Sequence, residues 1–161
     1  MATSSSDSLT SWVRTRLAAL YEFPSEAQQA ELQSSFDASF SPQAQILVNH
    51  APVARDAFKD DLSRRAIAAA RASVDWKELI EVPKADDADE AEIVAGCFVV
   101  TRSMKFRIRA APAQTHSTVI FSAKIDRDPN IHEGDPRHIV HLVQTVADKA
   151  APIHMQGVAQ S

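Results

Sequence analysis

The stretch IVAGCFVV at residues 93–100 decides the fold class, because a strand with this sequence is apolar on both faces. Successive side chains of a strand point to opposite sides of its sheet. One side would carry Ile93, Ala95, Cys97 and Val99, and the other Val94, Phe98 and Val100. An antiparallel sheet with water on one face would alternate apolar and polar residues instead. We predict that helices cover one face and that a second copy of the chain covers the other, in a two-fold dimer.

Further strands are predicted on both sides of this stretch. Residues 74–82 alternate in a period of two and end before Pro83, whereas 93–109 form a long strand that bends near Gly96 or around 101–103. The acidic residues 86–90 are the predicted hairpin tip between these two strands. Residues 118–126 follow an Ala-Pro-Ala-Gln turn and form the next strand. Together these segments predict a twisted antiparallel meander.

Residues 137–147 fit either a strand or a helix. Asp135 could cap a helix with Pro136 in its first position, and the apolar residues that follow fit helical spacing. However, the sequence IVHLVQTV at 139–146 is rich in β-branched residues and follows a loop-like segment at 128–135. We therefore predict a strand that joins the antiparallel sheet.

The first half of the chain is predicted to be mainly helical. An apolar stripe at three- and four-residue steps from Leu9 to Tyr21 predicts the first helix. Residues 28–39 and 55–73 predict two more helices, with a short strand at 44–48 between them. We expect residues 1–7 to be a disordered lead-in, 8–149 to be a single domain, and 150–161 to be a flexible tail.

Composition narrows the class of protein. The 161 residues are 45% hydrophobic and 24% charged, as expected for one soluble globular domain. The net charge of −4 offers no overall attraction for nucleic acid or an anionic membrane, so we predict neither as a partner. A single cysteine, Cys97, excludes an intrachain disulfide and favours a reducing compartment. With no signal peptide or long apolar run, we predict a cytoplasmic protein.

These elements predict an α+β fold in which three helices pack on a curved antiparallel sheet. The sequence FDASFSP at 36–42 leads into ILVN at 46–49 and then ARDAF at 54–58. With this order of elements, the chain resembles the nuclear-transport-factor-2-like superfamily. That superfamily includes scytalone dehydratase, ketosteroid isomerase and polyketide cyclases, alongside binding and transport adaptors. The resemblance implies a cone-like, cystatin-like α+β roll with a pocket and pairing through the sheet, but it leaves the function open.

The resemblance also implies that an enzyme of this group would place an Asp, Glu or His inside the cone to move a proton. No family motif can be carried across residue by residue. Ionisable residues within apolar segments are therefore the candidates, and Asp75, His116 and His141 are the proton carriers we name. For each of them, a solvent-facing or structural role is the alternative. The histidines lack metal-ligand spacing and there is no glycine-rich phosphate loop, so we predict no metal and no cofactor.

Two functional hypotheses follow. The first is a homodimer without demonstrable catalysis that binds a small apolar ligand or a protein partner in or on the cone. Its candidate pocket residues are Trp12, Tyr21, Phe40, Trp76 and Cys97. The second is a cofactor-independent dehydratase, isomerase or cyclase. In addition, Lys105, Arg107 and Arg109 share a strand face with Arg102 nearby, which indicates either a solvated face or contact with an anionic ligand or partner.

Overall fold

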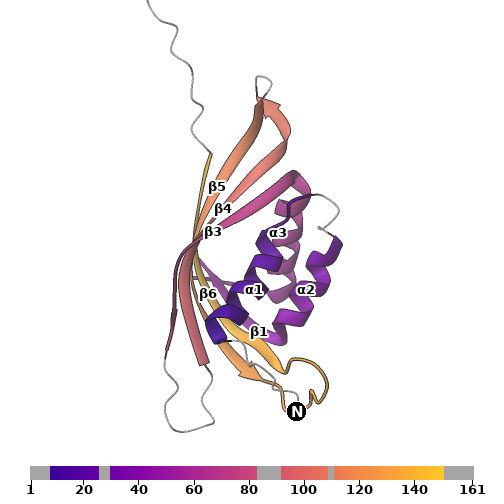
Figure 1. Cartoon of the computed structure of the whole chain (residues 1–161), viewed down its shortest axis with the longest axis vertical. Coiled ribbons are helices and arrows are strands. Elements are labelled where there is room, and N and C mark those ends of the chain that lie inside the picture. The colour runs from indigo at the N-terminus through magenta and orange to yellow at the C-terminus, as the bar shows by residue number, and fades with distance from the viewer. Residues whose placement is uncertain (1–7, 26–29, 83–91, 109–110, 151–161) are drawn as a thin grey trace, which may run out of the picture.

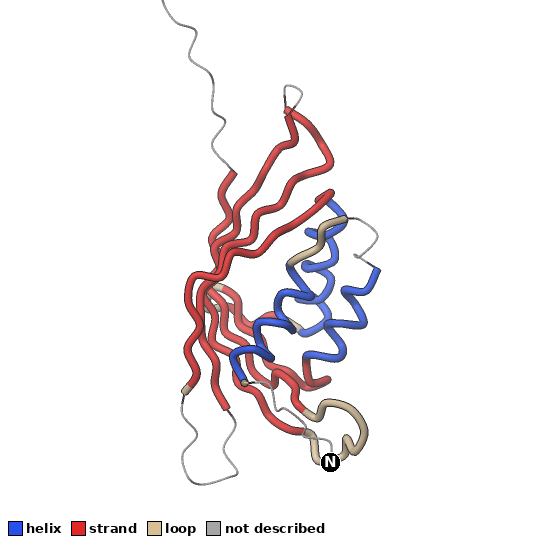
Figure 2. The backbone as a smooth tube through the Cα atoms, viewed as in Figure 1, coloured by secondary structure: helices blue, strands red, loops and turns tan. Residues whose placement is uncertain are grey.

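The computed structural model describes residues 8–25, 30–82, 92–108 and 111–150. Three helices pack on the concave face of one curved sheet (Figures 1 and 2). The helices are α1 (Leu9–Tyr21), α2 (Leu32–Ser39) and α3 (Arg55–Ala68). The strands are β1 (Phe40–Val48), β2 (Ala51–Val53), β3 (Ala69–Glu81), β4 (Glu92–Ile108), β5 (Ala111–Arg127) and β6 (Arg137–Ala150). The predicted α+β, cone-like class is confirmed.

The sheet has six strands in the order β2-β1-β6-β5-β4-β3. The predicted meander is present, because β3, β4, β5 and β6 pair antiparallel in sequence order. One pair differs from the antiparallel prediction: β1 runs parallel to β6, which makes the sheet mixed. Residues 137–150 are a strand, as predicted, and they hydrogen-bond to a neighbour on each side.

The core lies between the helices and the concave face of the sheet. The predicted stripe of α1 is buried throughout, and Phe36 and Phe40 stack with ring centroids 4.5 Å apart at the end of α2. From the sheet, Val94, Phe98 and Val100 of β4 are buried against these helices. Among the described residues, no helix is both long and apolar enough to cross a membrane.

Several predicted boundaries were wrong. The third helix ends at Ala68 rather than at residue 73, because Ala69–Ser73 pairs with β4 and Ala72 also bridges to Phe23. Strand pairing outweighs the helix propensity of these alanines. β1 starts at Phe40 rather than at 44, and β5 starts at Ala111 rather than at 118. The predicted lead-in at 1–7, the acidic tip at 86–90 and the tail beyond Ala150 lie outside the described residues.

A bulge in β3 changes which residues face the core. The β3–β4 register shifts between Trp76 and Glu78. As a result, Trp76 packs on Phe98 with centroids 4.8 Å apart, whereas Ile80 is 54% exposed on the convex side. The strict alternation predicted for residues 74–82 therefore holds only as far as Trp76.

Gly96 lies opposite this bulge, where the two strands come unusually close. A Cβ at this position would overlap the main-chain oxygen of Glu78 and the side chain of Leu79. This close approach requires glycine, because a main-chain atom cannot move aside without disturbing the pairing.

We expect Gly96→Ala to lower the free energy of unfolding by about 1–3 kcal/mol, because the added methyl overpacks the β3–β4 pair. Urea denaturation followed by circular dichroism would measure this. Ala95→Ser, which adds one atom to the neighbouring residue on the convex face, is the matched control. Equal stability of Gly96→Ala and the wild type would contradict the close approach.

Candidate functional site

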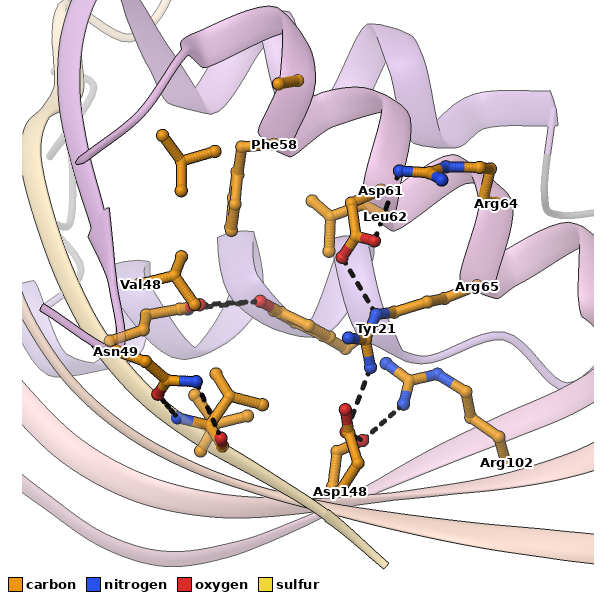
Figure 3. A pocket seen from close by; sticks show the side chains of 16 residues that line it. Tyr21, Val48, Asn49, Phe58, Asp61, Leu62, Arg64, Arg65, Arg102 and Asp148 are labelled. Atoms are coloured by element: carbon orange, nitrogen blue, oxygen red, sulfur yellow. Dashed lines mark hydrogen bonds and ion pairs between the residues drawn. The ribbon is translucent and has the colours of Figure 1, made fainter. Parts of the chain in front are cut away.

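A cavity of about 330 Å³ lies between α3 and the concave face of the sheet (Figure 3). Its walls come from the end of α1, from α3, from the β1–β2 turn, and from β4, β5 and β6. This size falls in the range of small-molecule sites in proteins.

Side-chain alternation along β5 and β6 forms the floor of the cavity. Ser117 and Val119 of β5 point inward, opposite Asp148 and Val146 of β6. Gln144 continues the same face of β6 and is almost completely buried. Strand geometry thus brings polar and apolar groups to a single surface.

Helix α3 supplies the opposite wall. Phe58, Asp61, Leu62 and Arg65 follow at three- and four-residue steps, so they lie on one side of the helix. Phe58 and Leu62 are buried and line the cavity together with Val48, Val119 and Val146 of the sheet. The cavity therefore has an apolar part and a charged part.

The β1–β2 turn closes one edge of the cavity. Asn49 and His50 both have positive φ angles, 52° and 66°, which asparagine tolerates better than most residues. The Asn49 side chain donates from Nδ2 to the Val146 oxygen at 3.2 Å and accepts from the Val146 nitrogen at 2.8 Å. These bonds fix the turn to β6.

The charged part centres on Arg65. Its Nε donates to Asp61 Oδ2 at 2.9 Å and its Nη1 donates to Asp148 Oδ1 at 3.0 Å. The Ser117 hydroxyl connects Asp148 to Arg102: it donates to Asp148 Oδ1 at 2.5 Å and accepts from Arg102 Nη1 at 2.7 Å. The hydrogen bond from Arg65 holds the pKa of Asp148 below its usual range, so this carboxyl stays ionised.

Tyr21 and Gln144 form a buried neutral pair in the same cavity. Gln144 Nε2 donates to the Tyr21 hydroxyl at 3.2 Å. Burial raises the pKa of Tyr21 above its ordinary value, so the phenol stays protonated at neutral pH. The Tyr21 ring also packs on Phe98 at 5.2 Å. Tyr21 can therefore offer both an apolar ring and a hydroxyl to a ligand.

The predicted proton carriers do not lie in this cavity. His116 and His141 alternate with the buried Ser117 and Leu142, so both are on the convex face, opposite Lys149 and Lys124. Asp75 is exposed there too, and it accepts a hydrogen bond from Lys77. None of the three lines a described cavity. Their catalytic role stays a prediction.

Of the five predicted pocket residues, Tyr21 lines the cavity. Phe40 is in the core and stacks on Phe36. Trp76 packs on Phe98. Cys97 is half-buried on the convex face. Their ligand-binding role likewise stays a prediction.

Trp12, the fifth of these residues, holds a loop instead. Its Nε1 donates to Asp135 Oδ2 at 2.6 Å, next to Arg16 and Arg137. Arg137 donates from Nε to Asp135 Oδ1 at 2.9 Å. Partial burial alone would raise the pKa of Asp135, but the bonds from Arg137 and Trp12 outweigh it and hold that pKa far below its usual range.

Most of the residues that line the cavity were not predicted from the sequence. Arg102 was mentioned only as a neighbour of the cationic strand face at 105–109. Arg65, Asp61 and Asp148 were not named as candidates. The spacing of Gln144, Val146 and Asp148 on one strand face was a usable signal once the strand was assigned. Within the described part of the chain, no group of His, Cys, Asp and Glu has the arrangement of a metal site.

Solved structures share this fold, although their sequences are very different. No protein-family model and no curated protein sequence matches the chain. A nuclear-transport-factor-2-like (NTF-2-like) protein of unknown function from Pseudomonas aeruginosa aligns with a TM-score of 0.51 and 12% identity, covering 84% of this chain and 95% of that one.

Two further neighbours are named proteins. Mtr2 from Candida albicans aligns with a TM-score of 0.54 and 15% identity, over 88% of this chain and 93% of that one. A hexachlorocyclohexane dehydrochlorinase, LinA-type3, from Novosphingobium barchaimii aligns with a TM-score of 0.54 and 8% identity, over 92% and 90%. At such identities the likeness shows the fold alone.

We expect Asp135→Asn to lower the free energy of unfolding at pH 7 by about 2 kcal/mol, because hydrogen bonds to a charged group are lost or weakened. Since the folded pKa of Asp135 is depressed, its stabilisation is full above the unfolded pKa of about 3.9 and is lost as the pH falls. The difference between wild type and variant should therefore shrink between pH 5 and pH 2.5.

Urea denaturation at several pH values measures this difference. Asp60→Asn, which changes an exposed aspartate of α3, is the control and should leave stability nearly unchanged. A constant difference between Asp135→Asn and wild type down to pH 2.5 would contradict the role of the Asp135 charge.

Proposed function

Because the chain adopts the nuclear-transport-factor-2-like fold, we propose that it binds a small, largely apolar ligand in the cavity between α3 and the sheet. The observation that carries this proposal is the cavity itself, which the surrounding side chains leave unfilled. A hollow of about 330 Å³ with buried apolar residues in its wall is large enough to hold a small molecule.

The lining of the cavity supports this ligand class. Apolar contact comes from Val48, Phe58, Leu62, Val119 and Val146, whereas the Arg102 guanidinium provides donors that can orient a ligand. Ligand sites commonly combine an apolar wall with a few placed polar groups. The structural neighbour named as a hexachlorocyclohexane dehydrochlorinase acts, by its name, on a small apolar molecule.

The carboxylates in the cavity are paired with Arg65, and this favours a binding role over acid–base catalysis. A general base works best when its pKa lies near the operating pH. Arg65 engages both Asp61 and Asp148, and the pKa of Asp148 is lowered rather than raised. Of the described residues that line the cavity, none is a histidine. A dehydratase, isomerase or cyclase would need a better base than these groups provide.

We further propose that the chain forms a homodimer through the convex face of the sheet. Ile120 on this face is 56% exposed, and Ile80, on the same face, is exposed to a similar degree. Ile93 and Val99 of β4 also point to this side and are only half-buried. Water contact with this apolar area is unfavourable, and a second copy of the sheet would remove it.

The cavity proposal can be tested by blocking the cavity. We expect wild-type protein to bind the neutral fluorescent probe N-phenyl-1-naphthylamine, with a rise in probe fluorescence. Val146→Trp places a bulky ring at the half-buried edge of the cavity and should weaken binding by about tenfold or more. Val82→Trp, an exposed residue remote from the lining, is the control. Absence of binding by wild type, or equal binding by Val146→Trp, would contradict the proposal.

The dimer can be tested by placing a charge on the convex face. Ile120→Lys should convert a dimer into a monomer in sedimentation-velocity experiments, because each lysine would bury a charge in an apolar interface. Ile67→Lys changes an isoleucine of α3 that is 62% exposed, and it should leave the dimer intact. A monomeric wild-type protein would refute homodimerisation and would favour a different protein as partner for this face.

A further inference from the structure

Arg102 is a buried cation in the cavity wall. It comes from β4, is only 6% exposed, and its guanidinium reaches into the cavity beside Asp148 (Figure 3). Among the described residues its only hydrogen-bond acceptor is the Ser117 hydroxyl at 2.7 Å, and no carboxylate lies within ion-pair distance. A guanidinium has five N–H donors, so most of them are left for another acceptor.

The carboxylates nearby are already engaged by a different arginine. Arg65 binds Asp61 through Nε and Asp148 through Nη1. Asp148 also accepts the hydroxyl of Ser117, which turns the oxygen lone pairs of that serine toward Arg102. Arg65 is thus paired twice, whereas Arg102 reaches Asp148 only through one hydroxyl.

A buried and incompletely paired guanidinium is costly unless an anion joins it. Burial lowers the pKa of Arg102, which records this cost, yet an arginine side chain still keeps its proton at physiological pH. Nearby carboxylates attract the charge only from beyond contact distance. A bound anion would satisfy the free donors and offset the desolvation.

The rest of the cavity restricts what the anion can be. Phe58, Leu62 and Val119 would contact the body of the ligand, so inorganic anions and highly charged ligands fit poorly. Asp61 and Asp148 would repel a second negative charge. A carboxylate matches the planar fork of a guanidinium.

Resting on the proposed function, we infer that the ligand is a small organic monocarboxylate. The Arg102 guanidinium binds its carboxylate, and the apolar wall formed by α3 and β5 contacts its aromatic or alicyclic body. Arg102 is then a specificity-determining residue that selects acids over neutral molecules of the same shape.

The test compares carboxylates with their matched primary amides. Benzoate, cinnamate, 2-naphthoate and cyclohexanecarboxylate, each beside its amide, would be titrated into the full chain by isothermal calorimetry. We expect at least one pair to bind wild type, with the carboxylate preferred by about tenfold or more. Arg102→Gln should reduce that preference to within about twofold while leaving amide binding nearly unchanged.

Two further variants complete the design. Arg102→Lys keeps the positive charge but lacks the planar pair of donors of a guanidinium, so it should show a reduced preference for the carboxylate. This variant keeps the inference testable even if Arg102→Gln does not fold. Arg71→Gln removes a cation from β3 outside the cavity lining, and it should keep the full preference. Equal binding of acid and amide by wild type, or an unchanged preference in Arg102→Gln, would overturn the inference while the proposed function stands. Failure of every probe to bind would contradict both.

Discussion

The register between β5 and β6 is the constraint on which the cavity depends. Val119 lies opposite Val146, and Ser117 lies opposite Asp148, so all four side chains reach the same side of the sheet. A slip of one residue would reverse the face of every side chain in the slipped strand. His116 and Thr118 of β5 would then face the helices, and Ser117 could no longer bridge Arg102 and Asp148. The chemistry of the cavity is therefore set by main-chain pairing before any side-chain contact forms.

The same constraint explains which parts of the structure could be predicted from sequence. The stripe of α1 and the strand character of 137–150 follow from local periodicity and β-branching, and both were predicted. The end of α3 was not, because alanines at 69–72 favour a helix locally and join a strand only through their pairing with β4. Local preference carries no information about a partner strand that lies some thirty residues away.

The cavity itself was harder to predict for a related reason. The β3–β4 pairing shifts register between Trp76 and Glu78, and the β5–β6 pairing shifts register between Lys124 and Ile125. Each shift changes whether the odd- or the even-numbered residues of the bulged strand face the helices. An assignment of inward residues by simple alternation fails beyond such a shift. Because of the second shift, His141 lies on the convex face although the buried Ile139 is two residues before it. Tyr21 lies in the cavity wall because its position follows from an uninterrupted helix, and its ligand-binding role stays a prediction.

The parallel pairing of β1 with β6 has a consequence for how the protein is made. Asn49 at the end of β1 bonds to Val146 of β6, 97 positions later in the chain. During translation, β1 can pair at once with β2, but its other edge stays without a strand partner until β6, which follows β5 in the chain, has been synthesised. Contacts between such distant residues also slow the search for the native state. Because β6 also supplies Gln144, Val146 and Asp148, the cavity is incomplete and its apolar wall is exposed until that strand joins the sheet.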